Sequence, residues 1–341
     1  MDATNKEYRI LTQPALDVVA IGNAIVDVIA QADDAFLAEH ALTKGGMQLI
    51  DAATADMLYG RMDTAMEVSG GSAANTLAGL AALGSRCGFI GQVANDQLGQ
   101  IFAHDIRALG VRYDTPPSNG GIPTARCLVM VTPDAQRTMG TFLGASQNLP
   151  ASALDPELIQ SGGILYLEGY LWDPEEPRKA MRDAIRLARE AGRKIAFTLS
   201  DGFVIERHRA DFMALIDQGL IDILFSNEAE IQALAQVDGF EEAVAAIAPK
   251  VPLLISTRSE KGAIAIANGG RHEVPAAPIT EVIDTTGAGD LFAAGFLAAH
   301  VEGKDIAHCL RLGALAAAEV ISHYGARPEA DLSELRAKAG L

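Results

Sequence analysis

This chain of 341 residues contains little cysteine and no segment with the pattern of a signal peptide or a membrane span. Cys87, Cys127 and Cys309 lie far apart, with no C-x-x-C pair or Cys/His spacing typical of a metal site. The sequence therefore predicts no disulfide framework and favours a reducing compartment. The N-terminus lacks the features of a signal peptide, and no apolar run reaches the roughly 18 residues of a membrane span. We expect a cytoplasmic protein that does not enter a membrane.

Positive charge is also in short supply. Lys and Arg number 27 against 44 Asp and Glu, which gives a net charge of −17. Because a nucleic-acid surface needs clustered cations, this balance argues against nucleic acid as a partner. It leaves room for an anionic ligand in a locally prepared pocket. Hydrophobic residues make up 49% and charged residues 21%, which excludes wholesale disorder and allows a sizeable core.

Several familiar catalytic fingerprints are missing. There is no G-x-x-x-x-G-K-[ST], so the chain is not a P-loop enzyme. No strand–G-x-G-x-x-G–helix unit appears, which argues against the interpretation as a nicotinamide-dependent oxidoreductase. The sequence also lacks G-x-S-x-G and H-E-x-x-H, and its seven histidines are scattered.

The sequence does contain short apolar runs that alternate with longer helical patterns. We expect strands at 17–21, 87–92, 164–168, 194–199, 221–226, 253–257 and 263–267. We expect helices at 73–83, 97–109, 175–191, 228–236, 240–247, 291–301 and 305–322. This alternation is typical of an α/β fold with a mostly parallel sheet and helices on both faces.

Two segments interrupt the alternation, at about 28–68 and 112–146. The second contains ARCLVMV, a TPDAQ turn and RTMGTFLGAS, a pattern that predicts a β-hairpin. A hairpin alone is marginally stable in water, so these segments should pack on the main domain or on another chain. We expect them to form a small β-rich lid inserted in a single fold that spans residues 1–341.

The sharpest motif is DTTGAGD at 284–290, directly before an amphipathic helix. Gly287, Ala288 and Gly289 let backbone N–H groups approach a ligand at the helix N-terminus, where the dipole favours negative charge. Asp290 lies in the first turn, where it would accept a proton from an attacking hydroxyl. We expect the dipole to keep Asp290 ionised. The alternative is a glycine turn with an Asp that caps the helix.

Two further motifs place polar groups where backbone can approach a substrate. Gly70 and Gly71 precede a helix of small residues, and Asn75 one turn later offers a donor and an acceptor. Asn23 and Asp27 follow the first strand, and ligands bind at the carboxyl ends of strands in open α/β sheets. The alternatives are a tight turn with an alanine-packed helix and an ordinary polar strand end.

A fourth motif, Asn227-Glu228-Ala229-Glu230, follows the apolar strand IDILFS. Oxygen ligands there suit Mg²⁺ held partly through water. The alternative is an N-capped helix with acidic residues in its first turn.

GGSAANTLAGLAALG and DTTGAGDLFAAGFL together resemble the two signatures of the ribokinase-like, or phosphofructokinase-B, carbohydrate kinases. The resemblance runs from about residue 17 to residue 328. It implies a three-layer α/β/α domain with a small β-rich lid. It also implies an enzyme that moves the γ-phosphoryl group of ATP, with Mg²⁺, to a hydroxymethyl group of a sugar or nucleoside.

The same resemblance assigns site residues in three groups. The base and the anion hole would be Asp290 with Gly287, Ala288 and Gly289. The sugar hydroxyls would be held by Asn23, Asp27, Gly70, Gly71 and Asn75. ATP would meet Asn227, Thr257 and Gly262, in a loop where this chain has Ser259 and family members often have glycine.

Charged positions follow from the resemblance as well. Arg137 matches a lid arginine that reaches the transferring phosphate. Asn227 and Glu230 match an N-x-x-E motif that organises Mg²⁺ and phosphates through water. Asp284 and Thr286 match positions that carry a monovalent cation such as K⁺ in some members.

Within the family, GNAIVD, LSDGF and DILFSNEAE are most similar to the adenosine kinase branch. Phe203 falls where an aromatic ring would stack on a purine, although it could equally be a core aromatic. A nucleoside is therefore the expected acceptor, with a plain sugar as the alternative. A sensor without catalysis is less compatible with Asp290, because a sensor needs no base. The lid would leave the chain a monomer or pair it into a homodimer.

Overall fold

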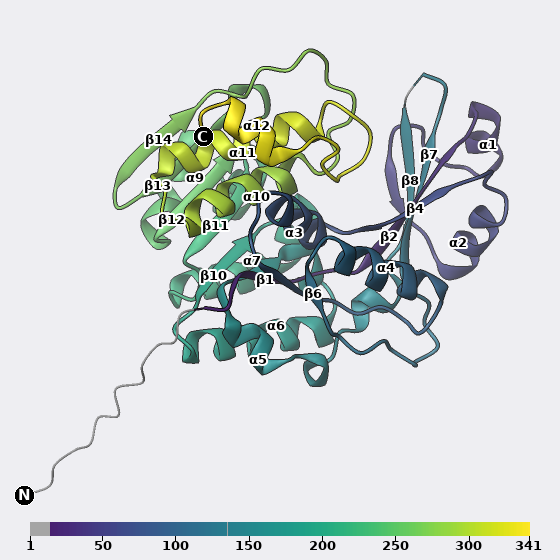
Figure 1. The fold of residues 1–341 in the computed structure, drawn as a ribbon, viewed down its shortest axis with the longest axis horizontal. Helices are drawn as coiled ribbons and strands as arrows, with labels where there is room; N and C mark the ends of the chain where they lie inside the picture. The colour runs from purple at the N-terminus through teal and green to yellow at the C-terminus, as the bar shows by residue number, and fades with distance from the viewer. Residues whose placement is uncertain (1–13, 135) are drawn as a thin grey trace, which may run out of the picture.

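The computed structural model describes residues 14–134 and 136–341, which form a large and a small β-sheet (Figure 1). The large sheet is parallel except at its last two strands, β13 and β14, which pair antiparallel. Its nine strands are, in spatial order, β14 (Gly270–Val274), β13 (Ala263–Ala267), β12 (Leu253–Thr257), β11 (Ile223–Asn227), β10 (Lys194–Thr198), β9 (Gly162–Glu168), β1 (Leu16–Ile21), β5 (Cys87–Ile90) and β6 (Arg112–Tyr113).

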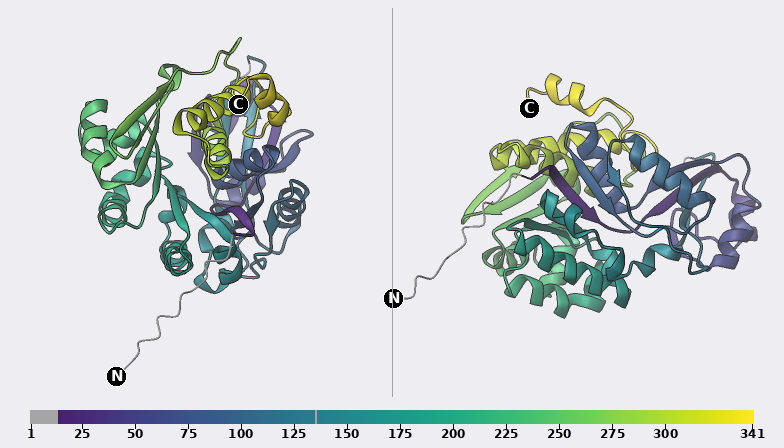
Figure 2. Two further views of the ribbon diagram at one scale, coloured as in Figure 1. Left: turned by 60° about the vertical axis from the view of Figure 1, so that its left-hand side comes forward. Right: turned by 60° about the horizontal axis from the view of Figure 1, so that its bottom comes forward.

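Helices cover both faces of the large sheet (Figure 2), and each face has its own hydrophobic core beneath the helices. The α/β prediction is therefore confirmed. One face carries α3 (Ser72–Ala82), α4 (Gln97–Ala108), α10 (Ala288–Val301), α11 (Ile306–Val320) and α12 (Leu332–Lys338). The other carries α5 (Pro156–Ser161), α6 (Glu175–Glu190), α7 (Gly202–Asp217), α8 (Glu228–Ala235) and α9 (Phe240–Ile247). Short 3-10 helices are η1 (Gly144–Asn148), η2 (Ala151–Ala153), η3 (Gly169–Trp172), η4 (Ala248–Lys250) and η5 (Ser259–Lys261).

The small sheet lies at one end of the molecule, on the right in Figure 1. Its strands are β3 (Met47–Leu49), β8 (Arg137–Phe142), β7 (Ala125–Val131), β2 (Ile25–Gln31) and β4 (Met66–Gly70), and α1 (Asp34–Glu39) and α2 (Ala52–Tyr59) lie between them in sequence. β7 and β8 pair antiparallel, as expected of a hairpin. The expected segments had different limits, because β2 starts before residue 28, β4 ends after residue 68, and β6 belongs to the large sheet.

The largest helix that the sequence pattern did not indicate is α7. Its buried residues lie near its two ends, separated by the polar stretch ERHRAD, and its backbone departs from helical values at His208 (φ −122°, ψ 15°). A helical hydrophobic period cannot run through such a kink, which explains why the pattern was weak. The seven strands and seven helices predicted elsewhere are present.

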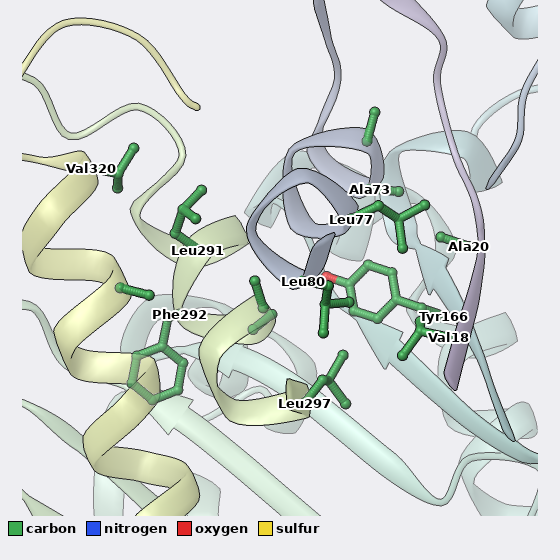
Figure 3. Close-up of a cluster of buried hydrophobic side chains, with 14 of the residues drawn as sticks. Val18, Ala20, Ala73, Leu77, Leu80, Tyr166, Leu291, Phe292, Leu297 and Val320 are labelled. Carbon is green, nitrogen blue, oxygen red and sulfur yellow. The ribbon is translucent and has the colours of Figure 1, made fainter. Parts of the chain in front are cut away.

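The N-termini of α3 and α10 are brought together by close packing of these two helices on the sheet (Figure 3). Leu77 and Leu80 of α3 pack in one core with Leu291 and Leu297 of α10 and with Tyr166 of β9. Small residues permit this approach, since a Cβ added at Gly79 would lie 2.6 Å from Leu291 Cδ1.

The strand order reverses direction at β1, whose neighbours β5 and β9 belong to opposite halves of the sheet. The carboxyl ends of parallel strands at such a switch point form the usual ligand site of an open α/β sheet. Residues that follow β1 and β9 are therefore placed to meet there.

Candidate active site

Asn23 and Glu168, which follow or end the two switch-point strands, are joined by hydrogen bonds. The backbone N and the side-chain Nδ2 of Asn23 both donate to Glu168 Oε1 at 2.7 Å. The other carboxylate oxygen, Oε2, accepts from the backbone N of Ala73 at 2.8 Å. Glu168 thus ties the end of β1 to the start of α3. Sequence reasoning gave Glu168 no role, because spacing cannot show which strand ends meet.

Burial dominates the electrostatics of Glu168. Its side chain has no exposed surface, and burial raises its pKa to about 7 although its donors act in the opposite direction. A Cβ added at Gly22 would lie 2.5 Å from Glu168 Oε2, so glycine is needed for this close approach. Burial thus favours the protonated form of Glu168 relative to an exposed glutamate.

Asp290 is held by two side chains from α3. Ser72 Oγ donates to Oδ1 at 2.6 Å, and Asn75 Nδ2 donates to Oδ2 at 3.1 Å. No side chain caps α10, so the alternative that Asp290 serves as a helix cap is wrong. Asn75 Oδ1 is inaccessible to solvent and has no hydrogen-bond partner among the described residues. A substrate hydroxyl would satisfy this acceptor.

The expectation that the helix dipole fixes Asp290 in its ionised form needs correction. Burial raises the pKa of Asp290 above its ordinary value, and the hydrogen bonds from Ser72 and Asn75 with the positive charge of Arg327 oppose that rise. Ionisation of Asp290 therefore depends on its neighbours.

The glycine turn before α10 leaves the backbone N–H groups of Gly287 and Gly289 without a partner among the described residues, whereas Ala288 N donates to Thr285 O at 3.2 Å. Gly287 has φ of +78° and is the N-cap of α10 without any side-chain cap, and Ala288 and Gly289 begin the helix. A Cβ added at Gly289 would meet nothing within 4 Å, so there is space in front of the helix N-terminus. Free N–H groups and open space are what an anion needs there.

Asp27 lies on β2 directly against the second glycine motif. A Cβ at Gly70 would come within 2.4 Å of Asp27 Oδ2, and a Cβ at Gly71, where φ is +97°, within 2.2 Å of Asn23 O. Burial raises the pKa of Asp27 to about 6, and the charges of Arg327 and Arg137 lower it. Four of the five predicted sugar-binding residues are thus in close contact: Gly70 with Asp27, and Gly71 with Asn23.

Arg137 of β8 reaches from the small sheet to the DTTGAGD loop. Its Nη1 pairs with Asp284 Oδ2 at 2.5 Å, and both side chains are only 8% exposed. The guanidinium lies 4.9 Å above the ring of Tyr324, while Nε and Nη2 have no hydrogen-bond partner among the described residues. Arg137 therefore links the small sheet to the loop before α10 through Asp284.

The same contacts leave little room for the expected monovalent cation. Asp284 Oδ1 accepts from Thr286 N at 3.0 Å and Thr286 Oγ1 at 2.7 Å, and Oδ2 accepts from Gly325 N at 3.0 Å besides Arg137. Both oxygens of Asp284 are taken by protein donors, so Asp284 and Thr286 do not fit K⁺ in this arrangement.

Asn227 and Glu230 form a capping box at the start of α8, so the alternative of an N-capped helix is confirmed. Glu230 accepts from Asn227 N at 3.0 Å and Nδ2 at 2.6 Å, and burial raises its pKa to about 7. Within residues 14–134 and 136–341, no group of three His, Cys, Asp or Glu is arranged to hold a metal. This pair fits Mg²⁺ only through water.

The expected nucleotide loop follows β11 and β12. Thr257 ends β12, and Gly262 (φ +86°) packs so closely that a Cβ would lie 2.0 Å from Val274 O. Ser259 between them has φ of +49°, a left-handed conformation that glycine adopts more easily. Glycine would therefore fit this position with less backbone strain than serine.

Two aromatic rings are exposed near the ends of β9 and β10. Phe203, in the first turn of α7, is 71% exposed, so the alternative that it is a core aromatic is wrong. Tyr170, which follows Glu168 after one residue, is 40% exposed. Burial is the main cause that raises the pKa of Tyr170, and the negative charges of Asp201 and Asp290 raise it further. Sequence reasoning missed Tyr170. The nearby Trp172 is fully buried and packs in the core.

An uncapped glycine turn, a held carboxylate and a polar switch point define a phosphotransferase that uses an alcohol as acceptor. The chain matches the model of the pfkB family of carbohydrate kinases over residues 16–332 and belongs to that family. Its relatives are adenosine and carbohydrate kinases, and its fold is ribokinase-like, with three α/β/α layers. Across the part that the structure describes, no helix is long and apolar enough to cross a bilayer.

Particular relatives include both nucleoside and sugar kinases. A probable sugar kinase from Rhizobium etli CFN 42 is 46% identical with a TM-score of 0.88, over 96% of this chain and 99% of that one. The adenosine kinase from Sinorhizobium meliloti is 45% identical with a TM-score of 0.87, over 95% of this chain and 99% of that one. The adenosine kinase of Saccharomyces cerevisiae is 25% identical over 334 residues, covering 90% of this chain and 95% of that protein.

Proposed function

We propose that the chain transfers the γ-phosphoryl group of ATP to the 5′-hydroxyl of a nucleoside, and that the nucleoside is adenosine. The observation that carries the proposal is the position of Asp290. This carboxyl group is held by Ser72 and Asn75 beside the open N-terminus of α10. A proton acceptor next to an anion site is what phosphoryl transfer to an alcohol requires.

In the proposed step, a bond forms between the 5′-oxygen and the γ-phosphorus while the bond to the β,γ-bridging oxygen breaks. Asp290 accepts the hydroxyl proton, and ADP leaves. The unpaired N–H groups of Gly287 and Gly289 stabilise charge on the transferring group. Because the transition state is loose and the proton leaves late, a weak base suffices.

The nucleotide would lie along the loops after β11 and β12, against Asn227, Thr257 and Gly262. Mg²⁺, when bound to the phosphates of ATP, neutralises their charge. In this proposal, Asn227 and Glu230 would hold Mg²⁺ only through water, because their side chains already bond to each other's backbone N–H groups in the capping box.

The ribose would be held where the switch-point residues converge. Asp27 accepts hydrogen bonds from vicinal hydroxyls, and Asn75 Oδ1, which has no partner among the described residues, accepts another. Asn23 is fixed by Glu168 and presents its remaining amide oxygen. Gly70 and Gly71 keep the backbone close to these groups.

The preference for a nucleoside is supported by the exposed rings of Phe203 and Tyr170. Exposed aromatic rings at a site rim offer a stacking surface for a purine, which a plain sugar does not need. Adenosine kinases at 45% and 25% identity support the same acceptor. The probable sugar kinase at 46% identity keeps a sugar as the second candidate.

A screen of ADP release tests the proposal. Purified protein with ATP and Mg²⁺ is offered adenosine, inosine, cytidine, ribose and fructose separately. We expect adenosine to give the highest kcat/KM, and Phe203→Ala to lower it for adenosine without lowering that for ribose. Turnover with a sugar alone would favour the second candidate. Ligand binding without ADP release for every compound would favour a sensor and overturn the proposal.

A further inference from the structure

Arg327 lies on the segment between α11 and α12 and contacts the small sheet. Its Nη2 donates to the backbone oxygen of Ser69 at 2.6 Å and to Ser69 Oγ at 2.9 Å. Ser69 is the residue of β4 directly before the Gly70–Gly71 turn. One guanidinium from the C-terminal segment therefore holds the strand that leads into the sugar-binding glycines.

Ser69 is held from the other side by Asp105 of α4. The backbone N and Oγ of Ser69 both donate to Asp105 Oδ2, at 2.7 Å and 2.6 Å. Arg327, Ser69 and Asp105 thus form a chain of hydrogen bonds that joins three elements far apart in sequence. This chain fixes the end of β4 and the turn after it.

Hydrogen bonding within the protein uses only part of the guanidinium. Nε and Nη1 of Arg327 are inaccessible to solvent and have no hydrogen-bond partner among the described residues. Buried donors without acceptors are costly. The hydrogen bonds to Ser69 thus account for only one nitrogen of the Arg327 guanidinium, and the effect of its positive charge on nearby groups is a separate contribution.

Arg327 is the cation that acts on both acidic groups of the site. Its charge opposes the rise in pKa that burial causes at Asp27 and at Asp290, whereas Arg137 acts on Asp27. In return, Asp105, Asp27 and Asp290 support the charge of Arg327, whose pKa burial lowers to about 10. Other ionisable groups share this field: Glu168, Tyr166 and Tyr170 respond to Asp290, and Cys127 responds to Asp27.

We propose that Arg327 is a positioning residue for phosphoryl transfer, which anchors the Gly70–Gly71 turn through Ser69 and balances the charges of Asp27 and Asp290. The proposal rests on the proposed function for the roles of these two carboxylates. It predicts that removal of the positive charge makes both carboxylates harder to ionise. Loss of the hydrogen bonds alone affects the geometry of the turn.

Arg327→Met and Arg327→Lys separate the two contributions in a pH profile of kcat. In Arg327→Met, we expect the acidic limb to move up by about one pH unit. In Arg327→Lys, which keeps the charge but loses the planar fork, the limb stays near that of the wild type while the KM of the acceptor rises. Arg126→Met is the matched control, because Arg126 is also buried but lies on β7 and pairs with Asp56.

Thermal unfolding supplies a readout that needs no substrate. When the pKa of a carboxyl group is higher in the folded state than in the unfolded state, the free energy of unfolding of the protein falls as pH increases. We expect Arg327→Met to raise the pKa values of Asp27 and Asp290 further. The melting-temperature deficit of Arg327→Met should therefore grow between about pH 5 and about pH 8. The deficit of Arg126→Met should stay constant over that range.

Parallel melting curves for Arg327→Met and wild type, or an unshifted acidic limb in a folded variant, would overturn the proposal. If Arg327→Met does not fold, Arg327→Lys decides, since wild-type KM and kcat in that variant would also overturn it. A wild-type protein that phosphorylates no acceptor refutes the proposed function, and the melting curves still decide whether Arg327 controls the two carboxylates.

Discussion

At the scale of single residues, Asp290 is the group on which phosphoryl transfer depends in our proposal. Asp290→Asn keeps the size of the side chain but cannot accept the proton of the substrate hydroxyl. We expect turnover to fall by a factor of about 100 to 10,000, the usual contribution of a general base. Adenosine binding should change little, because Asn23 and Asp27 remain. ADP release and calorimetric titration measure the two quantities.

The control for this substitution is Asp63→Asn, at an exposed position of the small-sheet segment. Turnover in Asp63→Asn should equal that of the wild type. An Asp290→Asn enzyme with near-normal kcat would show that another group, or water, takes the proton.

Glu168 gives a second prediction at this scale, in the pH dependence of stability. Its pKa of about 7 in the folded chain lies above the value of about 4.3 for an unfolded glutamate. The folded state therefore binds more protons between these values, so the free energy of unfolding falls as pH rises through this window. Glu168→Gln should lower the melting temperature but flatten its decline from about pH 5 to about pH 8.

Thermal melts of Glu168→Gln and of Glu157→Gln, an exposed glutamate at the start of α5, test this sign. The control should keep the slope of the wild type. A Glu168→Gln curve parallel to the wild type would mean that Glu168 is already ionised throughout the window.

Sequence motifs indicated the residues proposed to meet substrate, but not most of the residues that hold them in place. Asp290, the glycines and Asn75 stand in dense local patterns whose small residues announce close approach. Ser72 and Glu168 act on partners 218 and 145 residues away, so their roles depend on tertiary packing. Arg327 similarly meets Ser69 across 258 residues. No local spacing contains that information.

At the scale of elements, the packing of α10 depends on small residues at its contacts. A Cβ at Gly295 would lie 2.4 Å from the backbone oxygen of Leu312 in α11, and backbone cannot move aside cheaply. Gly295→Ala should therefore destabilise the protein by about 1–3 kcal/mol despite the better helix propensity of alanine. Chemical denaturation measures this difference in free energy.

Gly202→Ala is the matched control, since a Cβ at this first residue of α7 meets nothing within 4 Å. It should leave stability unchanged or slightly higher. Equal stability of both variants would show that α10 and α11 can separate without cost.

Elements with an uninterrupted hydrophobic period were the ones that sequence could predict. β11 and β12 are apolar because both faces of the large sheet are covered, and α6 has a continuous apolar face. α7 failed this criterion because charged residues surround its kink at His208. Short elements such as β6, with two residues, form only because a neighbouring strand is already in place.

At the scale of the whole molecule, the relation between the two sheets rests on contacts that the order of elements does not reveal. The alternation predicts one large sheet, and the interruptions predict a second small one. Arg137–Asp284 and Arg327–Ser69 then join the small sheet to the C-terminal part of the chain. Arg137 contacts the DTTGAGD loop directly, and Arg327 follows Gly325, whose backbone N donates to Asp284 at 3.0 Å, so both links connect the small sheet to the part of the site proposed for phosphoryl transfer.

Arg137→Met tests whether this link excludes water during transfer. The substitution leaves Asp284 as a buried charge without its cation, and loss of one partner of a buried pair costs about 3–5 kcal/mol. We expect the small sheet to close less often, so that water competes with the acceptor hydroxyl. The ratio of ADP released to phosphorylated nucleoside formed, one in a tightly coupled kinase, should rise above one.

Lys44→Met is the control, because Lys44 pairs with Asp34 and Asp134 inside the small-sheet segments and does not reach the large sheet. Its ratio should remain at one. The double variant Arg137→Met/Asp284→Asn removes the uncompensated charge and should recover part of the stability lost in Arg137→Met. Recovery of stability without recovery of coupling would mean that Arg137 itself, rather than a neutral Asp284, is needed to keep water out. A ratio of one in Arg137→Met would place the barrier to water elsewhere in the molecule.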